Sequence, residues 1–128
     1  MSLTFSKIAV VQSLPIGEMQ TGRRLRDDLD ALNVFHQRGI DVSFHNISGK
    51  SQFLACLTQL QQEAIQGIWP LLHIECHGAD DTTGIILADR SFIAWAELKP
   101  YLTTINIATH CNLLIVLGAC YGGSGRPR

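Results

Sequence analysis

The sequence carries almost no surplus of charge, since 10 lysines and arginines stand against 11 aspartates and glutamates in 128 residues. Such a balance gives no electrostatic reason to expect nucleic acid or an anionic membrane as a partner. The chain also lacks the roughly 20 consecutive apolar residues of a membrane span, and its amino terminus lacks the charged and then apolar order of a signal peptide. These absences predict a cytoplasmic protein with neither a nucleic acid nor a membrane as its partner.

Cysteine is too infrequent for a disulfide-rich scaffold, with four residues at Cys56, Cys76, Cys111 and Cys120. Four cysteines permit two disulfides, but 46% hydrophobic residues supply enough material for a core without such cross-links. No cysteines or histidines show the paired spacing of a structural zinc site. We therefore expect free thiols and no metal ion.

Short apolar runs and helical patterns alternate along the chain. Runs of apolar residues predict strands at 5–14, 40–47, 70–76 and 112–120. Leucines and other apolar residues at helical spacing predict helices from Thr21 to Phe35, from Ser51 to Ile68 and from Trp95 to Ile105, with Thr21 and Ser51 as possible N-caps. Residues 84–88 and 91–93 flank Asp89 and Arg90 and predict a short hairpin.

The alternation of strands and helices predicts the fold class. Strand, helix and strand in succession favour a parallel sheet with right-handed crossovers and helices on both faces. We therefore expect residues 1–128 to form a single α/β domain, a three-layer sandwich with a mainly parallel sheet. The four long strands should lie in the order 2-1-3-4, with the hairpin on the rim.

Two of these strands end in residues that can carry chemistry. The run at 112–120 stops at Cys120, and the run that begins at Pro70 stops at His77 and Gly78. In such sheets the carboxyl ends of the strands hold the functional groups, so neighbouring strands would bring His77 and Cys120 together. A histidine beside a cysteine raises its thiolate fraction, whereas either residue alone is more often an ordinary part of the core.

The sequence resembles the caspase-like cysteine peptidases, and most closely their bacterial CHAT branch. The resemblance rests on the order of elements and on the stretches HIECHG (73–78), GIILADRSFIAWAEL (84–98) and NLLIVLGACYGG (112–123). It implies a cysteine endopeptidase that cuts protein substrates through a thioester intermediate. By resemblance His77 is the general base, Cys120 the nucleophile, and the N–H groups of Gly78 and Cys120 form the oxyanion hole, with no acidic third member.

Caspase-like domains continue beyond the cysteine with further strands and helices, whereas eight residues follow Cys120 here. We therefore expect the dyad-bearing, N-terminal part of such a fold. The stretch 112–117 contains no charged residue and would be an unprotected sheet edge, so we expect a second chain or a second copy to cover it.

Charged residues near these segments suggest how a substrate is held. Arg23 and Arg24 lie where an arginine of the caspases binds an acidic substrate side chain, although they also fit a solvated basic face balanced by nearby aspartates. Asp80 and Asp81 follow His77 and could select a basic substrate residue, or be ordinary turn residues.

Two other functions are compatible with the same pattern. One is an inactive or truncated caspase-like interaction module that needs a partner or a further C-terminal segment. The other is a flavodoxin-like ligand-binding domain, which shares the alternation of strands and helices. Residues 13–15 after the first strand read Ser-Leu-Pro rather than a glycine-rich phosphate loop, so we expect no nucleotide or other cofactor.

Overall fold

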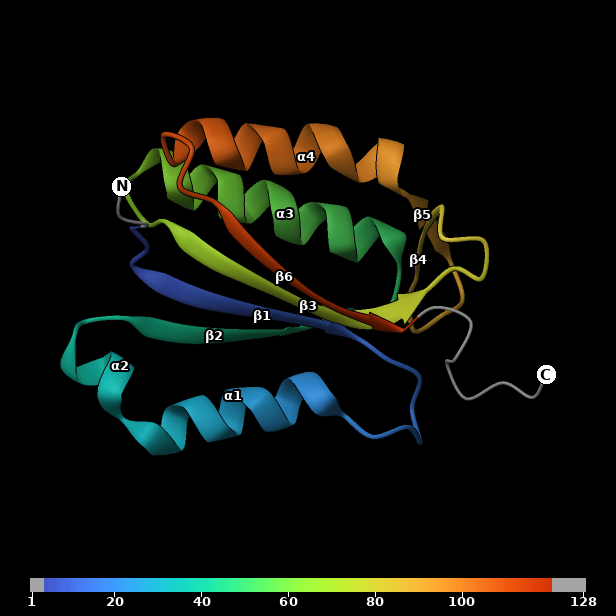
Figure 1. The fold of residues 1–128 in the computed structure, drawn as a ribbon, viewed down its shortest axis with the longest axis horizontal. Helices are drawn as coiled ribbons and strands as arrows, with labels where there is room; N and C mark the ends of the chain where they lie inside the picture. The colour runs from blue at the N-terminus through green and yellow to red at the C-terminus, as the bar shows by residue number, and fades with distance from the viewer. Residues whose placement is uncertain (1–3, 121–128) are drawn as a thin grey trace.

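The computed structural model of the chain describes residues 4–120. This part of the chain is an α/β fold in which a mixed, open sheet of six strands packs with four helices (Figure 1). The strands are β1 (Lys7–Ser13), β2 (Asp41–Asn46), β3 (Pro70–Gly78), β4 (Gly84–Ile86), β5 (Phe92–Ala94) and β6 (Leu114–Cys120). The helices are α1 (Thr21–Leu32), α2 (Val34–Gln37), α3 (Lys50–Ile65) and α4 (Trp95–Ala108).

The order of the long strands is β2-β1-β3-β6, which confirms the neighbours predicted from the sequence. Each of these three pairings is parallel. Strands β4 and β5 form the predicted hairpin, and β4 runs antiparallel to the end of β3, which makes the sheet mixed. Because β1 and β6 both pair with the same stretch of β3, they lie along its opposite edges, and β6 is the outer strand.

Helices lie on both faces of the sheet (Figure 1). Helices α3 and α4 cover one face and form the apolar core together with the strands, while α1 lies against the other face. The core side chains of α3 and α4 include Phe53, Leu57, Leu60, Leu98 and Ile105. None of the helices in residues 4–120 is both long enough and apolar enough to cross a bilayer.

Strand β3 alternates between buried and half-buried residues along its whole length. Leu72, Ile74 and Cys76 belong to the core that α3 and α4 cover. Since successive residues of a strand point to opposite faces, His73 and His77 lie on the α1 side. The candidate histidine is thus excluded from the apolar core.

The first predicted helix is two helices. Asn33 ends α1 in the left-handed conformation, with a φ of 57°, and α2 begins at the next residue. Asparagine tolerates this conformation better than most residues, so the apolar spacing through Phe35 did not reveal the break. Thr21 is the first helical residue rather than the N-cap, and its hydroxyl donates instead to the Glu75 carboxylate at 3.0 Å.

The second predicted helix also begins and ends differently. Helix α3 starts at Lys50 with Gly49 as its N-cap, so Ser51 lies inside the helix. Ile68, predicted on the buried side of this helix, lies beyond its end and is partly exposed. An apolar residue after a helix can continue the helical spacing by chance, which is why the pattern overran the true end.

Candidate functional site

The ends of β3 and β6 meet as predicted. The two strands are paired from Leu71 and Leu114 to His77 and Cys120, which are partners in the backbone register. The side chain of Cys120 lies outside the described part of the structure. Its separation from the His77 imidazole, expected at about 3 to 7 Å, therefore stays a prediction.

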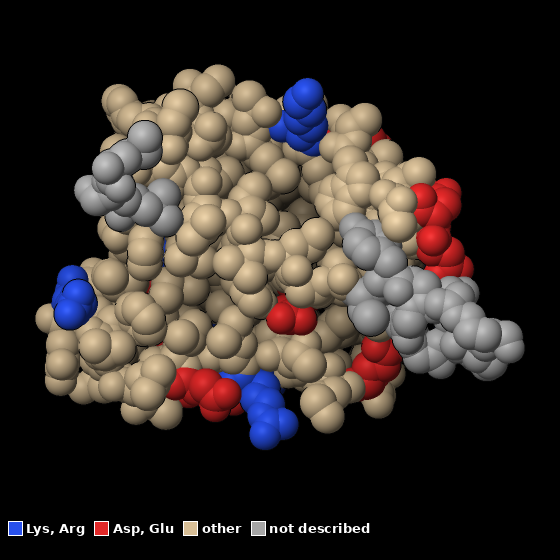
Figure 2. Space-filling view, viewed as in Figure 1, with Lys and Arg blue, Asp and Glu red and all other residues tan. Residues whose placement is uncertain are grey.

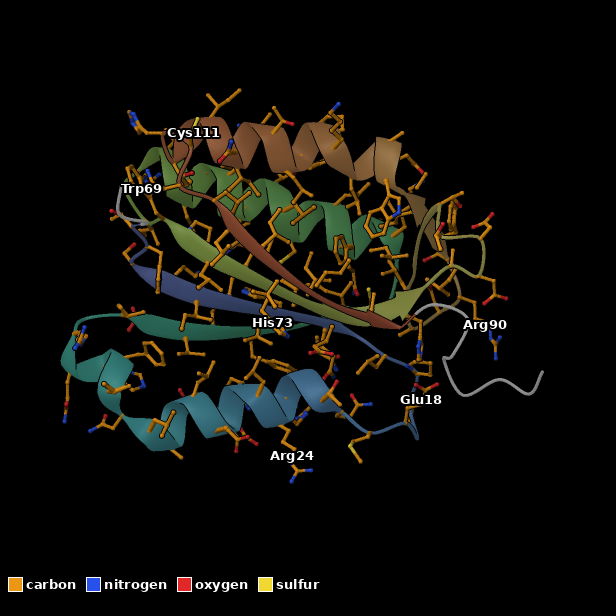
Figure 3. The ribbon with its side chains drawn as sticks, viewed as in Figure 1. Glu18, Arg24, Trp69, His73, Arg90 and Cys111 are labelled. Carbon is orange, nitrogen blue, oxygen red and sulfur yellow. The ribbon has the colours of Figure 1, made fainter. Side chains whose placement is uncertain are left out.

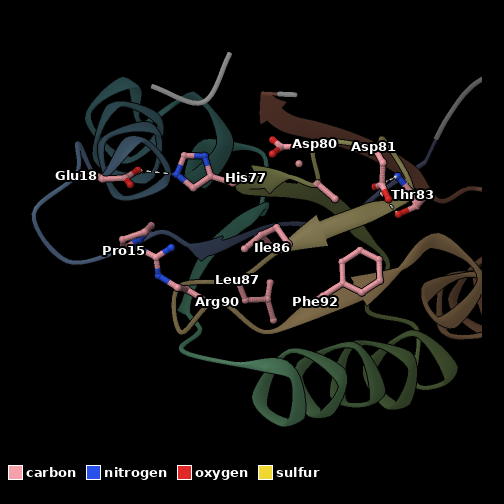
Figure 4. Close-up of a pocket in the computed structure, with 12 residues that line it drawn as sticks. Pro15, Glu18, His77, Asp80, Asp81, Thr83, Ile86, Leu87, Arg90 and Phe92 are labelled. Atoms are coloured by element: carbon pink, nitrogen blue, oxygen red, sulfur yellow. Dashed lines mark hydrogen bonds and ion pairs between the residues drawn. The ribbon is translucent and has the colours of Figure 1, made fainter. Parts of the chain in front are cut away.

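His77 is held by a carboxylate. Its Nε2 lies 2.6 Å from Oε1 of Glu18, and the two side chains are 23% and 46% exposed (Figure 4). Glu18 belongs to the loop after β1, in which Gly17 takes a φ of 96° that favours glycine. The contact therefore joins the carboxyl ends of two neighbouring strands, 59 residues apart in the sequence.

A cavity of about 850 Å³ opens beside this pair. Three parts of the chain line it: the loop after β1, the end of β3 with the following loop, and the hairpin (Figure 4). The lining residues include Pro15, Glu18, His77, Gly78, Asp80, Asp81, Thr83, Arg90 and Phe92. The volume lies in the range of small-molecule and side-chain binding sites, about 300 to 1,000 Å³.

The cavity has an acidic side. Asp81 accepts hydrogen bonds from the hydroxyl of Thr83 at 2.6 Å and from its N–H at 3.2 Å. These bonds favour the charged carboxylate and hold the pKa of Asp81 below its usual range. Asp81 thus keeps a negative charge in the cavity wall, and Asp80 lies beside it in the sequence and in the lining.

Glu18 and His77 also line a second cavity, of about 480 Å³, between the start of α1 and β6. Glu75 lies in its wall, where its carboxylate contacts Nε2 of His73 at 2.7 Å and accepts from Thr21. Gly118 of β6 stands beside Glu75, and a Cβ there would come within 2.6 Å of Glu75 Oε1. The absence of a side chain at Gly118 thus leaves room for the Glu75 carboxylate in its contacts with His73 and Thr21.

The described cysteines are free, as expected. Cys56 and Cys76 are buried, and burial raises the pKa of the Cys56 thiol to about 11 and that of the Cys76 thiol to about 12. A thiol with so high a pKa holds almost no thiolate near neutral pH and is a poor nucleophile. Cys111 is exposed at the opposite end of β6 from Cys120.

The structure brings only some of the predicted site residues together. His77, Gly78, Asp80 and Asp81 line one cavity, and Gly78 is also paired with Ile85 of β4. Arg23 and Arg24 are not among the residues that line it.

The two arginines are placed by α1. The Arg23 guanidinium lies over the Phe44 ring of β2, 5.4 Å from its centroid. Arg24 points away from the sheet (Figure 3). Arg26 stacks on the same ring at 5.0 Å, so this basic face is organised around an aromatic side chain of the neighbouring strand.

Sequence reasoning missed Glu18, Arg90 and Phe92 as parts of the site. A signal for Glu18 was present, because it follows the first buried strand and the carboxyl ends of parallel strands share one edge. Arg90 and Phe92 carry no such signal. They reach the cavity because the hairpin folds back beside the end of β3.

No protein-family model matches the chain, and no curated protein matches it. Residues 4–120 contain no group of three or more histidine, cysteine or acidic side chains placed to hold a metal ion. The groups that the described part of the chain brings to the candidate site are an imidazole, a carboxylate beside it, and a cavity with an acidic wall.

Proposed function

We propose that the chain is a caspase-like cysteine endopeptidase domain of the CHAT type, a three-layer sandwich built on a mainly parallel sheet. It would hydrolyse peptide bonds of protein substrates through a thioester intermediate. The observation that carries the proposal is the register pair of His77 and Cys120 at the carboxyl ends of β3 and β6. Residues paired across a parallel ladder share a face of the sheet, and a cavity of suitable size adjoins His77.

In the proposed reaction His77 takes the proton of the Cys120 thiol, and the thiolate sulfur attacks the substrate carbonyl carbon. The N–H groups of Gly78 and Cys120 stabilise the resulting oxyanion. His77 then returns the proton to the leaving amine as the C–N bond breaks and the thioester forms. Water, activated by His77, hydrolyses the thioester and releases the acid and the free thiol.

The proposed substrate contact is a basic side chain in the cavity. Asp81 is held as a carboxylate by Thr83, and Asp80 lines the same wall. Arg23 and Arg24 lie outside this cavity, so we assign substrate recognition to the aspartates rather than to the arginines. A lysine or arginine next to the scissile bond fits this charge.

A non-catalytic interaction module is the second candidate, and β6 favours it. Leu114, Ile115, Val116 and Leu117 are each about 40% exposed although all are apolar. Figure 2 shows that the middle of this face of the molecule carries almost no charged side chain. An uncharged outer strand suits pairing with a second copy of the chain, which is the role of an interaction module.

The test is cleavage of a mixed library of peptides, read by mass spectrometry as new termini. The wild-type chain is compared with Cys120→Ala and His77→Ala. The matched control is Cys111→Ala, which removes the exposed thiol at the far end of β6. We expect slow cleavage, enriched after lysine or arginine, that is lost in Cys120→Ala and His77→Ala and kept in Cys111→Ala. Cleavage that survives in Cys120→Ala, or no cleavage by the wild type, would refute the peptidase function.

A further inference from the structure

The contact between Glu18 and His77 has a direction. Glu18 Oε1 and His77 Nε2 lie 2.6 Å apart. An ionised carboxylate only accepts hydrogen bonds, so a hydrogen bond to it requires the proton to be on the imidazole nitrogen. In the neutral ring the other nitrogen, Nδ1, then holds the free lone pair. The carboxylate thereby selects one of the two tautomers and limits the rotation of the ring.

The strand order places Glu18 and Cys120 on different sides of His77. Glu18 comes from the loop after β1, which pairs with one edge of β3. Cys120 ends β6, which pairs with the opposite edge and has His77 as its register partner. A ring anchored at Nε2 on the β1 side therefore leaves Nδ1 for a group on the β6 side.

We propose that Glu18 is a positioning residue that holds His77 in the Nε2–H tautomer, so that Nδ1 is the base for the Cys120 thiol. This inference rests on the proposed function, and it adds the acidic member that the sequence did not predict. In the step concerned, the proton moves from Cys120 Sγ to His77 Nδ1, which gives a thiolate and an imidazolium. Nε2–H stays bonded to the Glu18 carboxylate, which stabilises the new positive charge and is itself not protonated.

A solvated ion pair without consequence is the competing explanation, because Glu18 is about half exposed and exposed pairs contribute little. Three features support a positioning role. The bond is short, and the pair forms part of the wall of both neighbouring cavities, where substrate and thiol would approach the ring. In residues 4–120, the carboxylate of Glu18 contacts the His77 ring, whereas the carboxylate of Glu75 contacts His73.

The first measurement is the tautomer of His77, read from the imidazole ¹⁵N shifts of the labelled protein under conditions in which the ring is neutral. Wild type should show the Nε2–H form. Glu18→Ala should shift His77 toward a mixture of tautomers, while the signals of His73 stay unchanged. Glu75→Ala is the matched control, since it removes the carboxylate from His73 and should leave His77 unchanged.

The second measurement is the rate of alkylation of Cys120 by iodoacetamide, with Cys111 in the same molecule as the internal reference. Glu18→Ala should slow the labelling of Cys120 about tenfold, by analogy with the lower end of the loss that follows removal of the carboxylate behind a metal-ligating histidine. Glu18→Gln keeps an acceptor oxygen without its charge and should recover part of the rate. Circular dichroism verifies that the variants fold, which we expect because Glu18 lies in an exposed loop.

The two proposals fail in different ways. If Glu18→Ala leaves both the His77 tautomer and the Cys120 rate unchanged while His77→Ala slows Cys120, Glu18 has no positioning role and the dyad stands. If His77→Ala does not slow Cys120 at all, the dyad itself is absent, and the proposed function is overturned together with the role of Glu18.

Discussion

At the scale of single residues, the chain separates its thiols by environment. Two are buried in the core, one is exposed near the start of β6, and Cys120 ends that strand opposite His77. Burial disfavours a charged thiolate, so the same side chain is inert in the core and reactive beside a base. The candidate chemistry therefore depends on where each cysteine stands more than on how many there are.

The buried Cys76 makes a prediction about alkaline pH. Burial raises its pKa to about 12, whereas in the unfolded chain a thiol titrates at about 8.5. Between these values the unfolded chain has released a proton that the folded chain retains, so the free energy of unfolding should fall as the pH rises above about 8.5. Urea denaturation at pH 8 and pH 10.5 should show a smaller fall for Cys76→Ala than for the wild type.

Val11→Ala is the control for this experiment. Val11 is fully buried in β1, so its truncation removes core packing without removing a titrating group. It should lower stability by a similar amount at both pH values. An equal pH dependence in Cys76→Ala and wild type would show that the thiol is not the source.

At the scale of elements, the hairpin β4–β5 closes one side of the cavity and is packed tightly against itself. Gly84 lies opposite Ala94, and a Cβ at Gly84 would come within 2.1 Å of the Ile93 carbonyl oxygen. Backbone atoms cannot move aside as a flexible side chain can. The hairpin thus requires glycine at this position for its close strand contact.

Gly84→Ala should therefore destabilise the protein by about 1 to 3 kcal/mol, the usual range for overpacking. Urea denaturation measures the loss, and Lys99→Ala on the exposed surface of α4 is the control, with an expected effect within about 0.5 kcal/mol. A Gly84→Ala protein as stable as the control would mean that the two strands can separate at no cost.

At the scale of the whole molecule, β6 is an apolar strand with one edge unpaired in the part of the chain described. A groove of about 600 Å³ between α4 and β6 adjoins it. Its lining is mainly apolar and also includes polar residues: Trp95, Ala96, Leu98, Leu102, Leu113 and Ile115 together with Lys99, Thr103 and Asn106. Native sheets protect such edges with charged residues, proline or a bulge. Residues 114–117 contain neither a charged residue nor a proline. Pairing of two copies along β6 would satisfy the edge hydrogen bonds and cover the groove.

The polypeptide of residues 1–128 should consequently associate with itself as its concentration rises, and sedimentation velocity measures this directly. Val116→Lys places a charge on the outer strand and should shift the equilibrium to monomer. Ile107→Lys is the matched control, because Ile107 is an equally apolar and more exposed residue on α4. A monomer at every concentration, or equal effects of the two lysines, would exclude β6 as the contact.

The sequence by itself determined the strand neighbours and the candidate pair at their ends. Continuous apolar runs mark strands buried on both faces, and the intervening helices require parallel crossovers, so the meeting of His77 with Cys120 follows from local pattern and chain connectivity. The hairpin was predicted for the same reason, since short apolar runs around a turn pair with each other.

Only the tertiary structure decided which other side chains lie near His77 and around the candidate site. The contact of Glu18 with His77 depends on the path of the loop after β1, and the positions of Arg23 and Arg26 depend on the ring of Phe44 from the next strand. Residue periodicity encodes which face of an element is buried. It carries no information on which residue of another element, tens of positions away, lies within 3 Å of a given atom, because that distance is set by how the whole chain packs.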